Sequence, residues 1–190
     1  MYTLFLDTHD QEVVVVLYKD KKVLNVVNEV SGFHHSQVAL PTIKSVLDNE
    51  GITPHDLGEI IVVIGPGSFT GVRIAVTIAK TMAYTLNIPI RTIDSLNIKA
   101  ISSNMKSDCY VSVLEKNGAY VGNFSKDGKK IGEYSYYGKS DYEKFIKDNK
   151  VIDVDKIDYE KVINFVGKQE PINPHSVKPL YIKRIEAIKK

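Results

Sequence analysis

Residues 60–80 read IIVVIGPGSFTGVRIAVTIAK, an apolar run, a glycine-rich turn and a second apolar run. The first run is continuous and ends at turn residues, as expected of a central strand buried on both faces. The second run has helical periodicity and continues to about residue 87. The stretch therefore predicts a strand, a tight turn and a helix, which is the connection that parallel strands of an α/β sheet require.

The segments around this unit extend the same pattern. Alternating and apolar residues predict strands, and 3.6-residue periodicity predicts helices, so residues 1–103 read β-β-β-α-β-α-β-α. The strands are expected over 2–8, 12–20, 22–31, 59–64 and 88–94, and the helices over 35–51, 70–87 and 95–105 with Ser95 as a candidate N-cap. We place a first lobe at 1–103 and a smaller second lobe with a C-terminal tail at 104–190, because the composition shifts near residue 104.

The second region is less regular. Three strands are expected over 109–137, with turns at Asn117-Gly118 and Asp127-Gly128, followed by a short helix over 140–149. The run KVINFVG, residues 161–167, is interpreted as a strand, and residues 177–190 as a tail. Its segment YIKRIEAIKK, residues 181–190, is either solvated or in contact with RNA phosphates or a partner.

Composition excludes several classes of protein. Cys109 is the single cysteine, so no intramolecular disulfide can form and a reducing, cytoplasmic compartment is expected. The first residues lack the features of a signal peptide, and no apolar stretch approaches the roughly 18 residues of a membrane span. Residues 101–190 carry 17 Lys/Arg against 13 Asp/Glu. This excess is too small to indicate nucleic-acid binding by itself.

The glycine turn fails the common phosphate and nucleophile motifs. No lysine follows Gly71, the spacing is one residue longer than G-x-G-x-x-G, and Ser68 is not in G-x-S-x-G. Two interpretations stay open. The turn is a tight corner with Ser68 or Thr70 capping the helix, or it is a phosphate contact at a helix N-terminus. The second interpretation involves Asp7, Gly65, Gly67 and Ser68, because an acid ending the first strand of such a fold can face a metal–phosphate group.

The helix after the turn has no polar side of the usual kind. One face is an ordinary core stripe, and the opposite face carries no charge. This indicates a helix buried either inside the domain or against a partner, and we favour the partner. The partner-facing residues are Ile74, Thr77, Ile78, Thr81 and Thr85. His34 and His35 are adjacent and therefore point apart, so we expect no metal site there and assign His35 to helix entry or to an interface.

These motifs together resemble one family. The string IGPGSFTGVRIAVTIAK is similar to the signature of the TsaB (YeaZ) family, bacterial proteins of the tRNA threonylcarbamoyladenosine pathway. Asp7-Thr8 ending the first strand, HSQVALPTIKSVL, NIPIRTIDSL and KPLYIKR resemble further family segments. The likeness is strong over residues 1–100 and weak over 101–178, where SVLEKNGAYVGNF lacks the family's Asp-Ala-Arg segment and the second lobe looks trimmed.

The resemblance implies an α/β, actin-like ATPase (ribonuclease H-like) fold of two lobes, and a non-catalytic scaffold rather than an enzyme. In that family the scaffold pairs with the catalytic subunit TsaD, which transfers threonylcarbamoyl to N6 of adenosine 37 in tRNAs reading ANN codons. The ATPase TsaE joins the pair. The resemblance also brings the helix from His35 through Ile43 to Leu47 into the partner surface.

Three further expectations follow from the same resemblance. The chain by itself binds no cofactor, although ATP or ADP could lie at the interface of the complex. The free protein could form a homodimer, and tRNA is reached through the complex. The alternatives are an ATP-binding or ATP-hydrolysing enzyme of the actin-like superfamily, a peptidase-like protein, or a tRNA-binding module that uses the basic second half.

Overall fold

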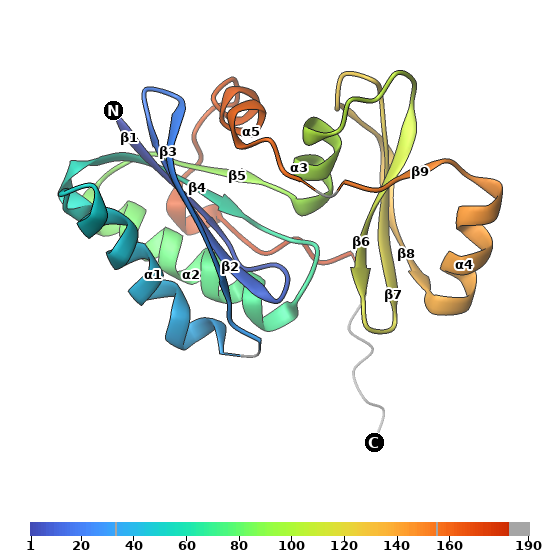
Figure 1. The fold of residues 1–190 in the computed structure, drawn as a ribbon, viewed down its shortest axis with the longest axis horizontal. Helices are drawn as coiled ribbons and strands as arrows, with labels where there is room; N and C mark the ends of the chain where they lie inside the picture. Colours follow the sequence, from blue (N-terminus) through green and yellow to red (C-terminus); the bar gives the residue numbers. More distant parts are fainter. Residues whose placement is uncertain (33, 155, 183–190) are drawn as a thin grey trace.

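A computed structural model describes residues 1–32, 34–154 and 156–182. Two β-sheets lie side by side, a five-stranded sheet in the order β3-β2-β1-β4-β5 and a four-stranded sheet in the order β8-β7-β6-β9 (Figure 1). The predicted α/β architecture of two lobes is therefore confirmed, and the second sheet is the smaller one.

The first sheet follows the predicted order of elements. Its strands are β1 (Tyr2–Asp7), β2 (Glu12–Lys19), β3 (Lys22–Val30), β4 (Leu57–Val63) and β5 (Ile90–Ile93). The three N-terminal strands pair antiparallel, while β4 pairs parallel to both β1 and β5. Both parallel pairs are reached through helices, as the sequence pattern predicts. A short 3-10 turn, Pro54–Asp56, precedes β4.

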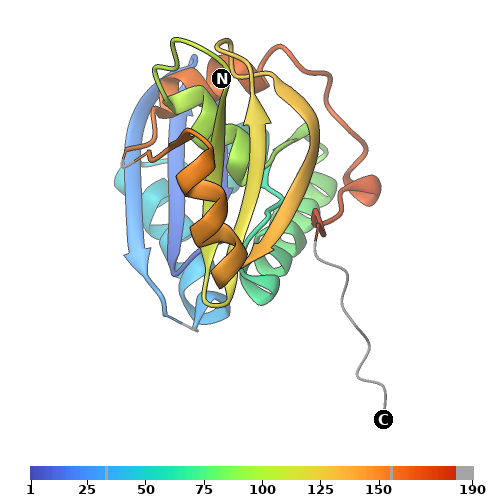
Figure 2. The same cartoon turned by 90° about the vertical axis from the view of Figure 1, so that its right-hand side faces the viewer.

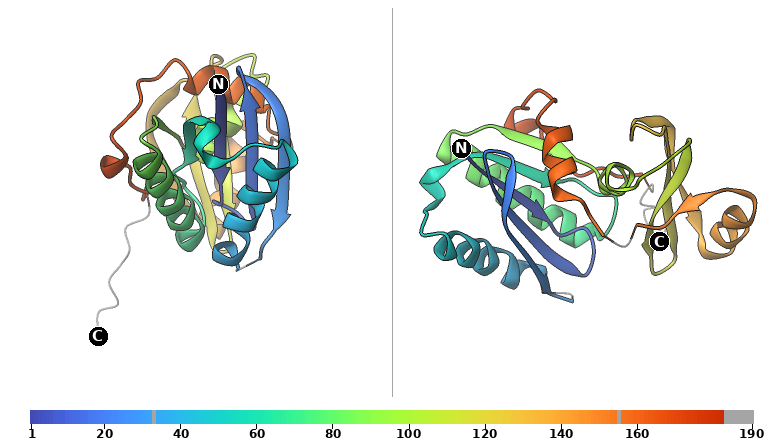
Figure 3. Two further views of the ribbon diagram at one scale, coloured as in Figure 1. Left: turned by 90° about the vertical axis from the view of Figure 1, so that its left-hand side faces the viewer. Right: turned by 45° about the horizontal axis from the view of Figure 1, so that its top comes forward.

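Helices cover both faces of this sheet, so its central strands are buried on both sides (Figures 1 and 3). Along β1, Leu4 and Leu6 face the cluster under α1 (His35–Asn49) and α2 (Phe69–Leu86). Phe5 faces the opposite cluster, to which α5 (Tyr159–Val166) contributes. The alternation follows from the two-residue period of a strand.

The second sheet packs on the first through a shared helix. Its strands are β6 (Cys109–Glu115), β7 (Gly118–Phe124), β8 (Lys130–Gly138) and β9 (Val151–Ile152). Helix α3 (Ser95–Ser102) lies between the sheets, with Ile98 in the first sheet's cluster and Leu96 and Ala100 in the second's. Helix α4 (Lys139–Asp148) packs on the far side, against β7 and β8 (Figure 2).

Two sequence interpretations are wrong here. The run 161–167 belongs mostly to helix α5 rather than to a strand, because Val162, Ile163 and Val166 lie on one face at helical spacing and are all buried. The N-cap of α3 is Asp94 rather than Ser95: its carboxylate accepts a hydrogen bond from the Asn97 N–H at 2.7 Å.

The C-terminal segment does not remain with the second sheet. Residues 157–182 return to the first sheet, where Val177 is buried in its core and the Leu180 N–H donates to the Ile64 carbonyl at 2.7 Å. Of the predicted tail 177–190, residues 177–182 are therefore docked, and the remainder lies outside the described residues. The lobe boundary near residue 104 stays a proposal, with this returning segment assigned to the first lobe.

Candidate functional site

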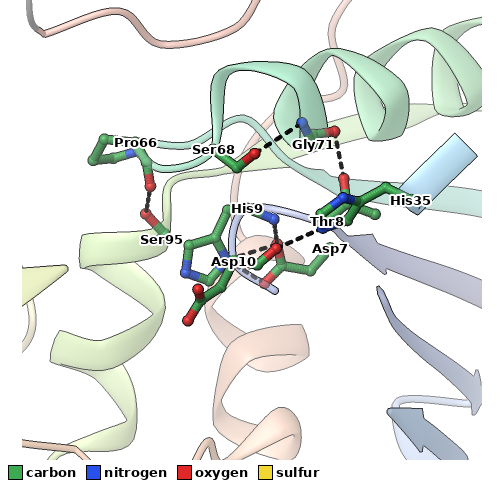
Figure 4. Close-up of polar contacts among 9 residues, drawn as sticks. All are labelled: Asp7, Thr8, His9, Asp10, His35, Pro66, Ser68, Gly71 and Ser95. Atoms are coloured by element: carbon green, nitrogen blue, oxygen red, sulfur yellow. Dashed lines mark hydrogen bonds and ion pairs between the residues drawn. The ribbon is translucent and has the colours of Figure 1, made fainter. Parts of the chain in front are cut away.

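The glycine turn meets the end of β1 as a tightly packed corner (Figure 4). A Cβ at Gly67 would lie 2.3 Å from the His9 carbonyl oxygen, and a Cβ at Gly71 would lie 2.0 Å from the Thr8 carbonyl oxygen. Neither position has room for a side chain. The glycines therefore allow close approach of two backbone segments, which is one of the two uses that the sequence leaves open.

Hydrogen bonds hold the corner together. Of the two predicted caps, Ser68 is the N-cap of α2, and its Oγ accepts from the Gly71 N–H at 3.2 Å. The Thr8 hydroxyl donates to the Gly71 carbonyl at 2.6 Å, and the Ser95 hydroxyl donates to the Pro66 carbonyl at 2.5 Å. The turn is thus tied to both β1 and α3, so it sets where α2 begins and which way it points.

Asp7 lies at the end of β1 and is paired with a histidine. His9 Nδ1 lies 2.7 and 2.8 Å from the two Asp7 carboxylate oxygens, and the His9 backbone N–H donates to the same side chain at 2.9 Å. Burial of the imidazole opposes its protonation, but the attraction and hydrogen bond of Asp7 outweigh burial, so the pKa of His9 is raised. The sequence analysis missed His9, whose only signal was its position two residues after Asp7.

Two of the N–H groups at this helix start already have partners within the chain. A phosphate at a helix start needs free backbone N–H groups. Here the Ser68 N–H donates to the His9 carbonyl at 2.7 Å, and the Gly71 N–H faces the Ser68 hydroxyl. Both Asp7 oxygens face His9. The corner is tightly packed, and the phosphate contact predicted from Asp7, Gly65, Gly67 and Ser68 stays a prediction.

Three residues assigned to a partner surface are buried instead. Ile43 and Leu47 have exposed fractions of 4% and 2% and lie in the core under the first sheet. His35 is 4% exposed, and its Nε2 donates to the Asp10 carbonyl at 2.6 Å (Figure 4). These residues cannot contact a partner directly, because α1 turns this face toward the sheet. They position α1 and the β1–β2 turn.

The exposed faces of α1 and α2 form a shallow groove. Its lining is almost entirely uncharged: Ser36, Leu40, Phe69, Thr70, Arg73, Ile74, Thr77 and Ile78. Ile74, Thr77 and Ile78 belong to the predicted partner face, and Thr81 and Thr85 continue that face along α2. Leu40 and Phe69 also line the groove and are 55% and 43% exposed, but they were not named among the predicted partner-surface residues. Leu40 was detectable as an apolar residue outside the core stripe of its helix.

The returning C-terminal segment lies beside the same helix (Figure 2). We call residues 174–182 the strap. The Lys80 ammonium donates to the His175 and Val177 carbonyls at 3.3 and 3.1 Å, and the Tyr84 ring meets the His175 ring edge-on at 4.9 Å. The strap therefore borders α2 on the side away from α1.

Within the described ranges, no three His, Cys, Asp or Glu side chains are grouped so that they could hold a metal ion. The same part of the chain contains no helix that is both long and apolar enough to cross a membrane.

Comparison with known proteins places this geometry among relatives. The family model for TsaD, tRNA N6-adenosine threonylcarbamoyltransferase, matches residues 18–154. The tRNA threonylcarbamoyladenosine biosynthesis protein TsaB of Bacillus subtilis is 39% identical over 100 residues, covering 53% of this chain and 44% of that protein. TsaB of Buchnera aphidicola (Schizaphis graminum) is 39% identical over 118 residues, covering 60% of this chain and 56% of that protein. The chain thus spans about half the length of these relatives.

A solved structure gives the same result for the fold. YeaZ from Pseudomonas aeruginosa superposes with a TM-score of 0.78 at 21% identity, covering 95% of this chain and all of that chain. At this identity the match concerns the fold.

Proposed function

Because the chain belongs to the TsaB (YeaZ) proteins of the TsaD family, we propose that it acts in tRNA threonylcarbamoyladenosine biosynthesis as a non-catalytic subunit. In this proposal it pairs with TsaD and activates the transfer of threonylcarbamoyl to N6 of adenosine 37 in tRNAs reading ANN codons. The observation that carries the pairing is the apolar groove between α1 and α2.

The groove has the composition of an interface rather than of a solvated surface. Leu40 and Phe69 are half exposed, and Ile74 and Ile78 line the groove while packing against the core below. Side chains this apolar gather on a surface mainly where a partner covers them. The groove also lies on two helices that the core and the corner hold in place, so the surface is formed before a partner arrives.

The corner supports the non-catalytic part of the proposal. Asp7 ends β1, and its carboxylate is engaged by His9. The N–H groups of Ser68 and Gly71 are satisfied within the chain. No observation favours an ATP-hydrolysing or peptidase-like enzyme, so we do not advance either of these alternatives.

The wider assembly belongs to the same proposal. TsaE joins the pair, ATP or ADP can lie at the boundary between subunits, and tRNA is reached through the complex. When TsaD is absent, the groove can serve a homodimer, since a two-fold interface uses one patch twice. The cytoplasmic location remains a prediction.

Co-purification with TsaD of the same organism, followed by light scattering, tests the pairing. We expect a stable 1:1 or 2:2 complex with the wild-type chain. Ile78→Glu should abolish it, because a charge in the middle of the groove must be desolvated without a partner. Ile146→Glu is the matched control: Ile146 is also a half-exposed helical isoleucine (44%), but it lies on α4.

Circular dichroism and urea unfolding of both variants show whether they fold. A folded Ile78→Glu protein that still binds TsaD would contradict the groove as the interface. A wild-type chain that forms no complex would contradict the pairing itself.

A further inference from the structure

At one end of the groove, two aromatic rings pack around a guanidinium group. The Arg73 guanidinium lies 3.9 Å from the Phe69 ring centroid and 5.8 Å from the Tyr181 ring centroid. The two ring centroids are 5.5 Å apart, and Arg73 Nε donates to the Tyr181 hydroxyl at 2.8 Å. The cluster joins the start of α2 to the strap, which are more than 100 residues apart in sequence.

This cluster holds Arg73 in one orientation while it stays exposed. Stacking on aromatic faces and the Nε hydrogen bond remove side-chain freedom that binding would otherwise have to remove. The rings themselves remain 43% and 48% exposed. An arginine restrained in this way is prepared to bind, because less conformational entropy is lost when its terminal nitrogens find a ligand.

The terminal nitrogens of Arg73 have no anionic partner among the residues that the structure describes. Arg91 offers a contrast, since it is paired with the buried Glu59 and donates to the Gln169 carbonyl. Arg73 is also the single charged residue in the groove lining. The groove therefore complements a surface that is apolar over most of its length and presents one anionic group at the Arg73 end.

We propose that Arg73, positioned by Phe69 and Tyr181, binds a carboxylate of TsaD at the strap end of the groove. This inference rests on the proposed function and deepens it, because it names the chemistry of the contact. A guanidinium group binds a carboxylate through two parallel N–H···O bonds, so the contact fixes the orientation of the partner as well as adding affinity. The strap becomes part of the docking surface, since Tyr181 supplies one side of the cluster.

Titration of the wild-type chain and its variants with purified TsaD at 50 and 500 mM NaCl tests this. We expect Arg73→Gln to weaken binding about tenfold or more at low salt and to reduce the salt dependence of Kd. Arg73→Lys should have a Kd between those of wild type and Arg73→Gln, because lysine keeps the charge but lacks the planar guanidinium group. Tyr181→Phe, which removes only the hydroxyl, should weaken binding a few-fold at most.

Lys144→Gln is the control, because Lys144 is an exposed cation on α4 (77% for the side chain), away from the groove. It should leave Kd unchanged at both salt concentrations. Glu186→Gln tests whether the carboxylate that Arg73 binds comes from this chain rather than from TsaD. A Kd for Arg73→Gln equal to wild type, with Ile78→Glu still disruptive, would overturn the inference and leave the proposed function standing.

Two other outcomes also count against it. If Glu186→Gln reproduces the loss seen with Arg73→Gln, the arginine pairs within its own chain. If the wild-type chain does not bind TsaD at all, the inference falls together with the proposed function. Unfolding curves for each variant separate lost binding from lost fold.

Discussion

The two sides of helix α2 differ sharply. On the side of β1, Gly67 and Gly71 touch the backbone of Thr8 and His9 with no space for a Cβ. On the side of α1, Phe69 and Ile78 line an open apolar groove. Both surfaces start at the glycine turn before α2. The chain itself fills the corner, whereas the groove is left uncovered.

The difference shows that one helix can combine a filled corner at its start with an exposed apolar face along its length. A helix start is an anion site only when its N–H groups are free. Here the His9 carbonyl accepts from the Ser68 N–H, and the Ser68 hydroxyl accepts from the Gly71 N–H. The corner fixes the direction of α2. A helix held in place with an apolar outer face is suited to binding another protein. Four predictions test this contrast.

The largest expected effect is on the closed side. Gly71→Ala places a Cβ 2.0 Å from the Thr8 carbonyl oxygen, so β1 or α2 must shift. We expect a loss of about 3 kcal/mol or more in the free energy of unfolding, at the upper end for overpacked sites. Urea unfolding measures it.

The matched control is Gly138→Ala, because no atom lies within 4 Å of its Cβ site and its φ of −63° suits any residue. Its cost should stay below about 1 kcal/mol. Equal costs at the two glycines would mean that the corner is looser than described.

A smaller effect is expected from the buried threonine of the corner. Thr8→Val removes the hydroxyl that donates to the Gly71 carbonyl at 2.6 Å while keeping the shape. A buried hydrogen bond of this kind is worth about 1–2 kcal/mol. Thr85→Val is the control, because it removes an exposed hydrogen bond from the Thr85 hydroxyl to the Thr81 carbonyl on α2. It should lower the free energy of unfolding by less than about 0.5 kcal/mol. Thermal or urea unfolding of both variants would show no difference if the two sides of α2 were equivalent.

The Asp7–His9 pair should make stability depend on pH. The pKa of His9 is raised in the folded state, against burial, by the charge and hydrogen bond of Asp7. Its contribution is therefore complete below the unfolded pKa of about 6.5 and is lost as the pH rises through the folded pKa. Unfolding free energies between pH 5.5 and 9 should fall with pH in this window. The fall should be smaller in His9→Gln and unchanged in His55→Gln, which is outside the corner.

The smallest expected effect is a null result with nucleotide. A ligand present at 100 times its Kd stabilises a protein by about 2.7 kcal/mol, which raises the Tm by several degrees in a chain of this size. We expect millimolar MgATP to raise the Tm of the isolated chain by less than about 1 °C. A larger rise that Asp7→Ala removes would show that the corner opens for a nucleotide after all.

Prediction from sequence succeeded where a short segment carries its own signal. The order of elements in residues 1–103, the turn at Gly118, the Ser68 cap and the outward position of Ile74 and Ile78 follow from local periodicity and turn chemistry. It failed where the answer depends on distant contacts. The run 161–167 was predicted as a strand, whereas its apolar residues pack against the first sheet from one face of a helix.

The candidate site divides in the same way. Periodicity places Thr77, Thr81 and Thr85 on the exposed face of α2, while Ile43 and Leu47 were assigned to the surface by resemblance and lie in the core. His9 was missed because an acid and a histidine two residues apart have no local signature. Tyr181 was missed because its contact with Arg73 joins residues 108 positions apart.

Local spacing is enough to predict the α/β class, the strand–turn–helix unit at residues 60–80 and a helix without a charged outer face, because each depends on residues within a few turns of chain. The filled glycine corner and the open groove, in contrast, are visible only in the folded protein. Those properties depend on where the Thr8–His9 turn and the strap come to lie against α2. Contacts between segments this far apart in the chain are set by packing of the whole fold, and no local pattern encodes them.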